Sequence, residues 1–247
     1  MPFEWHSFPE AKAAAVACAE QIGRQIEEAL GGRGNATLAL SGGTTPKPMF
    51  ARLAAMKLPW DRIHVFWVDE RAVPPNDAES NYKLAAELLL VPARVPQRNI
   101  HRIRGEMVAE AAARAYSQQI RDFFGLDPGE MPEFDVVHRG MGPDGHTGSL
   151  FPGQPLIEDR QGLAAAVYVE KMSMWRITLL PGPLLAARNT IVLVAGADKA
   201  QALRSVFNEP YDPVCYPAQL GAREGRPVVW YMDQAAAGLL EGAEAAG

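Results

Sequence analysis

The sequence has few cysteines and no recognisable metal-binding motif. It contains only two cysteines, Cys18 and Cys215, which lie far apart and form no C-x-x-C pair. This excludes a disulfide framework and the common zinc and dithiol motifs. The sequence also lacks an H-E-x-x-H motif and any cluster of carboxylates that would suggest a metal site. We therefore expect a protein that works without a metal, a redox group or any other cofactor.

Long hydrophobic runs and excess positive charge are also missing. No apolar run approaches the roughly 20 residues needed to cross a membrane, and the N-terminal sequence MPFEWHSFPE lacks the basic and apolar parts of a secretory signal. The chain has 24 basic and 29 acidic residues, for a net charge of −5, whereas sequence-independent binding of nucleic acid needs concentrated positive charge. We therefore expect a cytoplasmic protein with no membrane or nucleic-acid partner. Its composition leaves open whether it is a monomer or a small homo-oligomer.

The pattern along the chain is that of an alternating α/β protein. Its 247 residues, of which 48% are apolar, predict a single domain over residues 1–247. Strands are predicted at residues 36–41, 63–69, 134–140, 164–170, 175–180, 190–196 and 227–233. Helices are predicted at residues 7–32, with Gly31 and Gly32 as the stop, and at 46–56, 82–90, 106–124 and 198–207. This alternation is typical of a doubly wound, mostly parallel sheet with helices on both faces, as in Rossmann-like folds.

Polar clusters follow several of the predicted strands. Sheets of this kind bind ligands beyond the carboxyl ends of their strands. The clusters are residues 41–45, residues 69–71, residues 140–148 and Asp233. We therefore expect site residues from several of these segments to meet at one edge of the sheet.

The first cluster, SGGTTPKP, has the composition of an anion-binding turn. Gly42 and Gly43 allow a tight turn and close approach to a ligand, while Ser41 and Thr44 add hydroxyl donors. Pro46 begins a predicted helix whose N-terminal N–H groups would face the same anion. The segment matches neither the Walker A motif nor G-x-G-x-x-G, so a nucleotide is not indicated. From the local sequence alone, an ordinary capped turn is an equal alternative.

Three charged residues, Asp69, Glu70 and Arg71, end the predicted strand at residues 63–69. If the sheet is covered on both faces, three adjacent charges at a strand end are poorly placed for a simple surface turn. They are therefore candidates for ligand binding, with a salt-bridged loop as the alternative.

The segment GMGPDGHTGSLFPG gives the sharpest functional signal in the sequence. Its glycines allow unusual backbone dihedrals and close approach to a ligand. His146 is of the residue type most easily poised as a base near neutral pH, and Asp144 could orient its imidazole. A lone histidine is more often structural, but this one lies in a glycine-rich loop at a strand end. We therefore favour a catalytic role.

Two cations and two further histidines lie near these clusters or within strands. Lys171 and Arg176 flank the MSMW segment and could neutralise a phosphate. Taken alone, a pair of solvated charges is the simpler interpretation. His138 alternates with apolar residues just before the glycine-rich segment, so we expect it in the core or beside the site. His64 lies within a predicted strand and is expected to be structural.

Taken together, these segments resemble the 6-phosphogluconolactonase family. The resemblance rests on SGGTTP, WVDERAVPPNDAESNY, GMGPDGHTGSLFPG and RITLLPGPLLAARNTIVLVAGADKA, in the family's order, and covers about residues 38–233. It implies a fold shared with glucosamine-6-phosphate deaminase and ribose-5-phosphate isomerase. The deaminase has DEY where this chain has residues 69–71, and Ala-Phe-Asn-Glu-Pro where it has residues 148–152. Both differences favour the lactonase.

The chain also departs from the family's pattern at three places. Gly148 stands where alanine is common. His138 and Arg139 replace two residues that are usually apolar, and residues 172–175 replace a proline-rich stretch. The residues implied in catalysis are unaffected by these departures.

The resemblance implies hydrolysis of 6-phospho-D-glucono-1,5-lactone to 6-phosphogluconate, in the oxidative pentose phosphate pathway, with a small sugar phosphate as the binding partner. His146 would take a proton from the attacking water, Asp144 would orient His146, and Arg71 would stabilise negative charge near the substrate or on the developing oxyanion. Asp69 would bind sugar hydroxyls or fix Arg71. The phosphate and sugar would be held by Ser41, Gly42, Gly43, Thr44, Lys171 and Arg176.

Two other classes of function stay open at this point. A sugar-phosphate isomerase or deaminase would use the same fold, with His146 assisting ring opening. A non-catalytic sugar-phosphate sensor is the other alternative. No added DNA-binding segment is recognisable, and the Asp144-Gly145-His146 sequence is intact, which disfavours a sensor.

Overall fold

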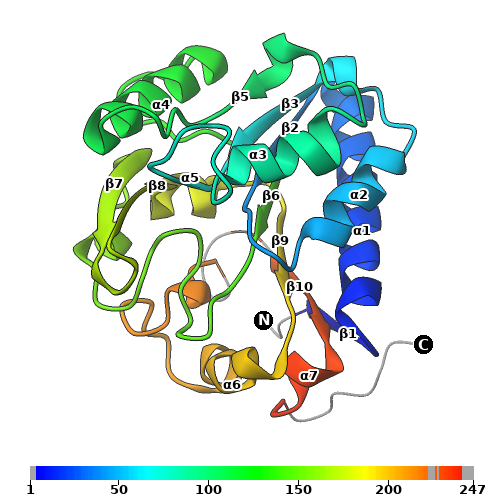
Figure 1. Ribbon diagram of the computed structural model, residues 1–247, viewed down its shortest axis with the longest axis vertical. Helices are drawn as coiled ribbons and strands as arrows, with labels where there is room; N and C mark the ends of the chain where they lie inside the picture. The colour runs from blue at the N-terminus through cyan, green and yellow to red at the C-terminus, as the bar shows by residue number, and fades with distance from the viewer. Residues whose placement is uncertain (1–3, 222–225, 227, 241–247) are drawn as a thin grey trace.

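The computed structural model describes residues 4–221, 226 and 228–240, which form two sheets surrounded by helices (Figure 1). The strands are β1 (Glu4–Phe8), β2 (Ala36–Leu40), β3 (Ile63–Trp67), β4 (Asp69–Arg71), β5 (Ile100–His101), β6 (Val136–Arg139), β7 (Ala164–Val169), β8 (Met174–Leu179), β9 (Thr190–Val194) and β10 (Val228–Asp233). Seven of them form a parallel sheet in the order β1-β10-β9-β6-β2-β3-β5. The other three form an antiparallel sheet in the order β4-β8-β7.

Most of the predicted helices are present. The α-helices are α1 (Ala11–Arg33), α2 (Lys47–Ala55), α3 (Asn81–Ala85), α4 (Ala109–Phe124), α5 (Pro181–Ala186), α6 (Ala200–Asn208) and α7 (Gln234–Ala237). A π-helical turn, Ala86–Leu90, continues α3. Short 3₁₀ turns cover Trp60–Arg62, Gln97–Asn99, Pro155–Glu158, Glu170–Met172, Ala197–Lys199 and Pro217–Gln219. Within the described part of the chain, no helix is long and apolar enough to cross a membrane.

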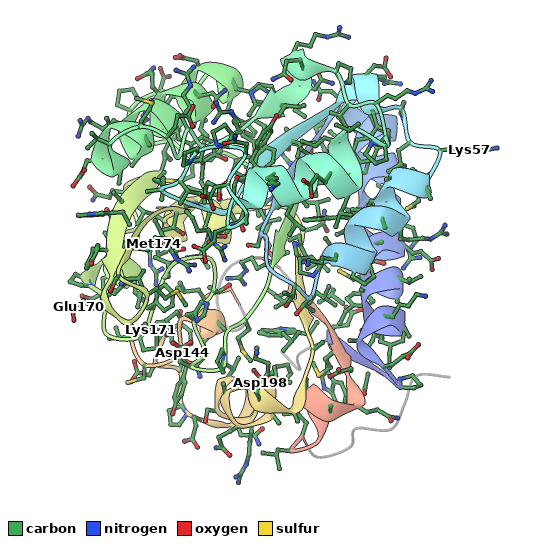
Figure 2. All side chains as sticks on the ribbon, in the orientation of Figure 1. Lys57, Asp144, Glu170, Lys171, Met174 and Asp198 are labelled. Atoms are coloured by element: carbon green, nitrogen blue, oxygen red, sulfur yellow. The ribbon has the colours of Figure 1, made fainter. Side chains whose placement is uncertain are left out.

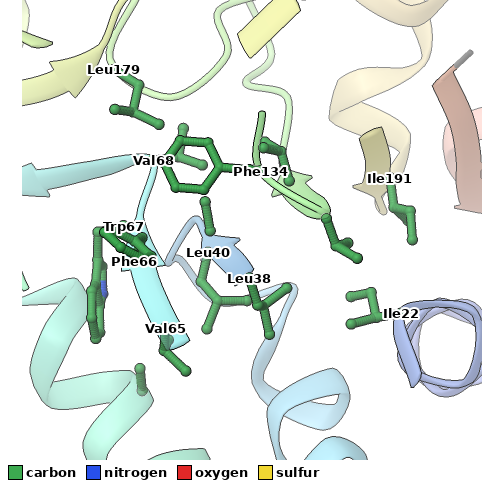
Figure 3. Packing of buried hydrophobic residues seen from close by; sticks show 14 of the residues in the cluster. Ile22, Leu38, Leu40, Val65, Phe66, Trp67, Val68, Phe134, Leu179 and Ile191 are labelled. Atoms are coloured by element: carbon green, nitrogen blue, oxygen red, sulfur yellow. The ribbon is translucent and has the colours of Figure 1, made fainter. Parts of the chain in front are cut away.

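Helices cover both faces of the larger sheet, so the predicted doubly wound α/β architecture is confirmed. On one face α1 packs against β2, β9 and β10, and on the other α7 packs against β10 and contacts α6. Alternate side chains of β9 point to opposite faces of the sheet. Ile191 and Leu193 pack in the core that includes α1, whereas Val192 and Val194 pack with Leu203 of α6. Figure 3 shows part of the larger core, built around β2 and β3.

The first strand was missed by the sequence prediction, which placed a helix from Ser7. Residues Glu4–Phe8 instead pair in parallel with β10, with Ser7 opposite Met232. The backbone partners of this strand lie at the other end of the chain, so no local pattern could reveal them. The predicted helix end was also too early, because α1 continues to Arg33 and stops at Gly34, which has φ 81°. A positive φ of this kind is typical of a glycine at a helix C-terminus.

The smaller antiparallel sheet is the main departure from the expected architecture. The sequence predicts one strand over residues 63–69, but the chain leaves the larger sheet at Val68. The Val68 N–H donates to Leu40 O at 2.9 Å, while its carbonyl accepts from the Leu179 N–H at 2.7 Å. Val68 therefore connects the two sheets. The strands predicted at 164–170 and 175–180 are present, but they form an antiparallel hairpin because the turn Glu170–Ser173 is too short for a parallel crossover.

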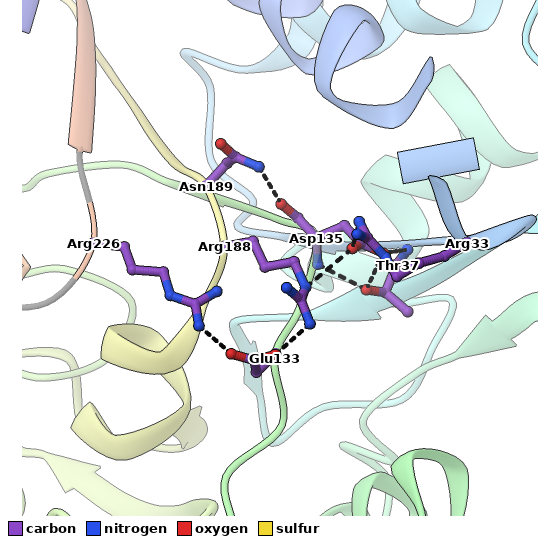
Figure 4. A network of polar contacts seen from close by, with 7 residues as sticks. All are labelled: Arg33, Thr37, Glu133, Asp135, Arg188, Asn189 and Arg226. Atoms are coloured by element: carbon purple, nitrogen blue, oxygen red, sulfur yellow. Dashed lines mark hydrogen bonds and ion pairs between the residues drawn. The ribbon is translucent and has the colours of Figure 1, made fainter. Parts of the chain in front are cut away.

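A polar network around the buried side chains of Asp135 and Thr37 joins the amino ends of β2, β6 and β9, at the edge of the sheet opposite the predicted site (Figure 4). Asp135 is its centre: its carboxylate accepts from the Thr37 N–H at 2.8 Å and from the Thr37 hydroxyl at 3.0 Å. It also pairs with Arg33, and Arg188 Nε lies 3.7 Å away. The Thr37 hydroxyl oxygen accepts from the Asp135 N–H at 2.8 Å. These bonds fix β2 against the segment leading into β6.

Replacing Asp135 by alanine should therefore destabilise the fold. The change leaves the buried N–H of Thr37 without its acceptor, and leaving a buried donor unpaired costs about 1–3 kcal/mol. Urea unfolding at pH 7, followed by circular dichroism, measures the effect. The matched control is Asp61→Ala, at an exposed position, which should change the free energy of unfolding by less than about 0.5 kcal/mol. Equal effects of the two substitutions would contradict the structural role of the network.

Candidate active site

The candidate site lies where the strand order of the larger sheet reverses. From β2 the chain builds outward through β3 and β5, whereas β6 lies on the other side of β2 and is followed outward by β9 and β10. The loops after β2 and β6 therefore diverge and leave a crevice at their carboxyl ends. The Ser41 N–H donates to His138 O at 3.2 Å and holds the two strand ends together. The crevice contains a cavity of about 190 Å³.

The cavity brings together most of the residues singled out in the sequence. Those that line it are Ser41, Gly42, Gly43, Thr44, Asp69, Arg71, His146 and Arg176. Asp144 and Lys171 do not line the cavity. Asp144 instead contacts the ring of His146. Asp233 does not line it either: its carboxylate accepts from the Ala236 N–H at 2.8 Å and caps α7.

The SGGTT loop owes its shape to contacts with α3. Gly43 has φ 104°, a value that side chains rarely tolerate. The Asn81 side chain donates to Asp69 O at 2.9 Å, and its Oδ1 lies 2.0 Å from where a Cβ on Gly42 would be. Any side chain at position 42 would therefore collide with Asn81. The loop leads directly into α2, whose first N–H groups are suited to bind an anion.

Glu70 anchors the charged segment that forms β4. Its buried carboxylate accepts from the N–H groups of Arg71 at 2.8 Å, Asn81 at 2.7 Å and Tyr82 at 2.7 Å. The Ser80 hydroxyl donates a further bond at 3.0 Å. Burial raises the pKa of Glu70 above its ordinary value, although all four hydrogen bonds act in the opposite direction. Glu70 thus ties β4 to the start of α3 and points away from the cavity.

The pairing of β4 with β8 sets two arginines opposite each other. Arg71 is the register partner of Arg176, and Asp69 is the partner of Thr178. Alternation along β4 puts Asp69 and Arg71 on the same side, toward the cavity. Arg71 Nη1 donates to Glu79 O at 2.7 Å. Among the described residues, the buried Nε atoms of both arginines have no hydrogen-bond partner.

The two guanidinium groups affect each other electrostatically. Burial, followed by the charge of Arg71, lowers the pKa of Arg176, and the carboxylate of Asp69 partly opposes this. Like charges set directly opposite in an antiparallel pair are destabilising. Together with the free Nε donors, this arrangement is suited to an anion that contacts both groups.

His146 and Asp144 form a hydrogen-bonded pair on the loop after β6. His146 Nδ1 lies 2.5 Å from Asp144 Oδ1, and the other carboxylate oxygen pairs with the ammonium of Lys171 (Figure 2). Burial would raise the pKa of Asp144, but the hydrogen bonds from His146 and Lys171 outweigh it and hold the pKa below its ordinary value. An ionised Asp144 accepts the Nδ1 proton, which leaves Nε2 of the neutral imidazole as a proton acceptor.

Hydrogen bonds within the loop that carries this pair fix its conformation. The Gly142 N–H donates to His146 O at 2.9 Å, and the Thr147 hydroxyl donates to Gly140 O at 2.9 Å. A Cβ on Gly142 would lie 1.9 Å from the His146 ring, so the imidazole packs flat against the backbone only because residue 142 is glycine. The Phe151 ring lies beside His146, with the ring centres 4.3 Å apart and the planes tilted by 31°. These contacts leave the imidazole little freedom to turn.

Lys171 differs most from its predicted place. The resemblance implied that it would hold the phosphate or sugar, whereas in this structure its side chain is half exposed and its ammonium pairs with Asp144. The same ammonium lies 4.5 Å from the centre of the Phe151 ring. Its charge therefore supports the carboxylate that orients His146. Arg176, the other predicted cation, does line the cavity.

Three polar side chains outside the predicted clusters also line the cavity. Lys199, which pairs with Asp198, lines the cavity from the loop after β9. Asn81 contributes from α3 and His138 from β6 itself. Lys199 could have been predicted as a site residue, because it follows a predicted strand. Asn81 could not, because only the folded chain brings α3 to the site. Within the described residues, no group of three or more His, Cys, Asp or Glu side chains could hold a metal ion.

Comparisons with known proteins find similar sequences over most of the chain. The model of a family described as glucosamine-6-phosphate isomerases/6-phosphogluconolactonase matches residues 9–230. The 6-phosphogluconolactonase of Nostoc sp. is 40% identical over 217 residues, which are 87% of this chain and 89% of the relative. The 6-phosphogluconolactonase of Haemophilus influenzae is 35% identical over 207 residues, which are 82% of this chain and 87% of the relative.

Solved structures are similar over nearly the whole chain. The 6-phosphogluconolactonase of Trypanosoma brucei matches with a TM-score of 0.86 and 28% identity, covering 97% of this chain and 99% of that one. A monomeric glucosamine-6-phosphate deaminase matches with a TM-score of 0.81 and 19% identity, covering 96% and 100%. The latter similarity shows the fold alone.

Replacing Lys171 by methionine should raise the pKa of Asp144 toward the ordinary aspartate range. The substitution removes one of the two side-chain hydrogen bonds that favour the ionised carboxylate, while burial continues to disfavour it. Carbon-detected NMR titration of the aspartate carboxyl groups measures the change. The control is Lys57→Met, at an exposed position away from Asp144 (Figure 2), which should leave the titration of Asp144 unchanged. An identical Asp144 titration in wild type and Lys171→Met would show that the ion pair does not form in solution.

Proposed function

Because the chain belongs to the glucosamine-6-phosphate isomerase/6-phosphogluconolactonase family, we propose that it hydrolyses 6-phospho-D-glucono-1,5-lactone to 6-phosphogluconate, a step of the oxidative pentose phosphate pathway. One observation carries this proposal: a single cavity holds a histidine paired to an ionised aspartate and two arginines set opposite each other. The histidine suits attack on an ester carbonyl, and the arginines suit a phosphate.

The phosphate is proposed to lie between Arg71 and Arg176, next to the SGGTT loop. Its two negative charges relieve the repulsion between the guanidinium groups, and its oxygens accept from the unpartnered Nε donors. The N–H groups of Gly43 and Thr44 and the start of α2 complete the anion site. In this arrangement Arg71 stabilises the permanent negative charge of the substrate.

The lactone carbonyl is proposed to lie beside His146. Nε2 takes a proton from a water molecule as the water oxygen bonds to the carbonyl carbon. The bond from that carbon to the ring oxygen then breaks, and the His146 proton passes to the leaving ring oxygen. The products are a free hydroxyl and a carboxylic acid, which ionises at neutral pH. Asp144 keeps the imidazole in the required tautomer and stabilises its transient positive charge.

Asp69 and Lys199 are proposed to contact the sugar between these two ends. The Asp69 carboxylate accepts from the Ser149 hydroxyl at 2.8 Å, which fixes it at the cavity wall. From there it can accept from a sugar hydroxyl while supporting the positive charge of Arg176. Lys199 reaches the cavity from the loop after β9 and provides a further charged donor.

The reaction class can be tested with two substrates in parallel. Freshly prepared 6-phosphogluconolactone should release acid faster than its spontaneous hydrolysis, because a base and a phosphate site are held in one cavity. Glucosamine 6-phosphate should release no ammonia, because residues 69–71 and 148–152 differ from the deaminase sequence. A pH indicator follows the first reaction and a coupled ammonia assay the second. Ammonia release without acceleration of lactone hydrolysis would assign the protein to the other branch of the family.

Replacement of His146 tests its role as the general base. Both His146→Ala and His146→Gln should lower kcat by about 10²–10⁴-fold, because a base of this kind contributes that much and an amide cannot accept a proton at neutral pH. KM should change little, since the phosphate contacts are untouched. His6→Gln, at a position outside the cavity, is the control and should keep wild-type rates. Near-wild-type kcat in His146→Gln would leave only a positioning role for His146 and make Asp69 the next candidate base.

A further inference from the structure

His138 is a buried histidine on the floor of the cavity that the hydrolysis described above does not use. It is the third residue of β6, between the SGGTT loop after β2 and the His146 loop that follows β6 itself. The side chain is only 1% exposed, yet it lines the cavity. Arg139 next to it points the other way, since its guanidinium donates to Leu220 O at 2.7 Å. Of these two neighbouring side chains, only His138 reaches the cavity.

The imidazole of His138 has unused hydrogen-bonding capacity. Among the described residues, neither ring nitrogen has a hydrogen-bond partner, and the same holds for the hydroxyl of Ser41. Both residues line the same cavity, and the Ser41 N–H donates to His138 O, so the two residues are neighbours at the cavity wall. Buried polar groups in native proteins almost always have partners, because leaving one unpaired costs about 1–3 kcal/mol. The missing partner is therefore expected to come from the molecule that fills the cavity.

The charge state of His138 restricts what that partner is. Burial lowers its pKa to about 3, so the ring is neutral under ordinary conditions and has one N–H donor and one acceptor nitrogen. An ionised phosphate has only hydrogen-bond acceptors, so the donors of Arg71 and Arg176 suit it better than His138 does. A sugar hydroxyl both donates and accepts, which matches a neutral imidazole and a serine hydroxyl. His138 lines the same cavity as the arginine pair and His146, so it can contact the ring of a substrate that spans them.

We propose that His138, with Ser41, binds one secondary hydroxyl of the sugar ring and makes the enzyme selective for substrates that carry it. This rests on the proposed function, because the hydroxyl belongs to the phosphorylated lactone assigned to the cavity. His138 acts as a specificity residue and takes no part in proton transfer. The selectivity should therefore appear in kcat/KM and depend on which hydroxyl the substrate carries.

The test compares four lactones with two proteins. The lactones are 6-phosphogluconolactone and its 2-deoxy, 3-deoxy and 4-deoxy analogues, and the proteins are wild type and His138→Leu, which fills a similar volume without polar atoms. Wild type should lose about tenfold in kcat/KM on one deoxy lactone, as expected for one neutral hydrogen bond and its unpaired partner. His138→Leu should lose about tenfold on the parent lactone and show no further loss on that same deoxy analogue.

Controls separate this role from packing and from failure of the proposed function. His6→Leu, outside the cavity, should keep the wild-type pattern, and His138→Gln should restore part of the selectivity because its amide also donates and accepts. If His138→Leu does not fold, the same four rates with His138→Gln decide between selectivity and uniform loss.

An equal loss on all four lactones, or no loss at all, would overturn the role of His138 while leaving lactone hydrolysis intact. Absence of wild-type hydrolysis of the parent lactone would overturn the proposed function and, with it, this assignment.

Discussion

The antiparallel pairing of β4 with β8 is the interaction on which the candidate site depends. It holds Arg71 directly opposite Arg176, an arrangement of like charges that is unfavourable until an anion lies between them. The pairing is possible because the chain leaves the larger sheet at Val68, which bonds to both sheets. Glu70, buried on the opposite side of β4, then fixes the strand to α3. The fold thus keeps two cations close together, which suits a dianionic phosphate better than a neutral ligand.

The rest of the site follows from the crevice between β2 and β6. The loop after β2 meets the arginine pair, and the loop after β6 carries His146 with its partner Asp144. In the proposed binding mode, a phosphorylated sugar spans these two loops, with its phosphate at the guanidinium groups and its carbonyl at the imidazole. His138 lines the same cavity, and its ring nitrogens have no partner among the described residues. In that mode, binding of the phosphate would set the distance between the carbonyl and the base.

Features encoded by neighbouring residues could be predicted from the sequence, and features that depend on distant pairing could not. The α/β alternation, the SGGTT loop and the Asp144–His146 pair are all local, and the structure has each of them. The smaller sheet was missed because β4 lies about a hundred residues before β8 in the chain. The contact of Lys171 with Asp144 depends on the same sheet, since Lys171 lies in the turn between β7 and β8. The burial of His138 could be expected from its alternation with apolar residues, but its lack of a partner could not.

The most direct test of this account is a crystal structure of the protein with bound 6-phosphogluconate, the product of the proposed reaction. The phosphate should lie within hydrogen-bond distance of both Arg71 and Arg176, and the carboxylate formed from the lactone carbonyl should lie beside His146 Nε2. A product bound in the reverse direction, with its phosphate at His146, would contradict the account. So would a phosphate that contacts neither arginine, because the opposed guanidinium groups would then have no part in binding.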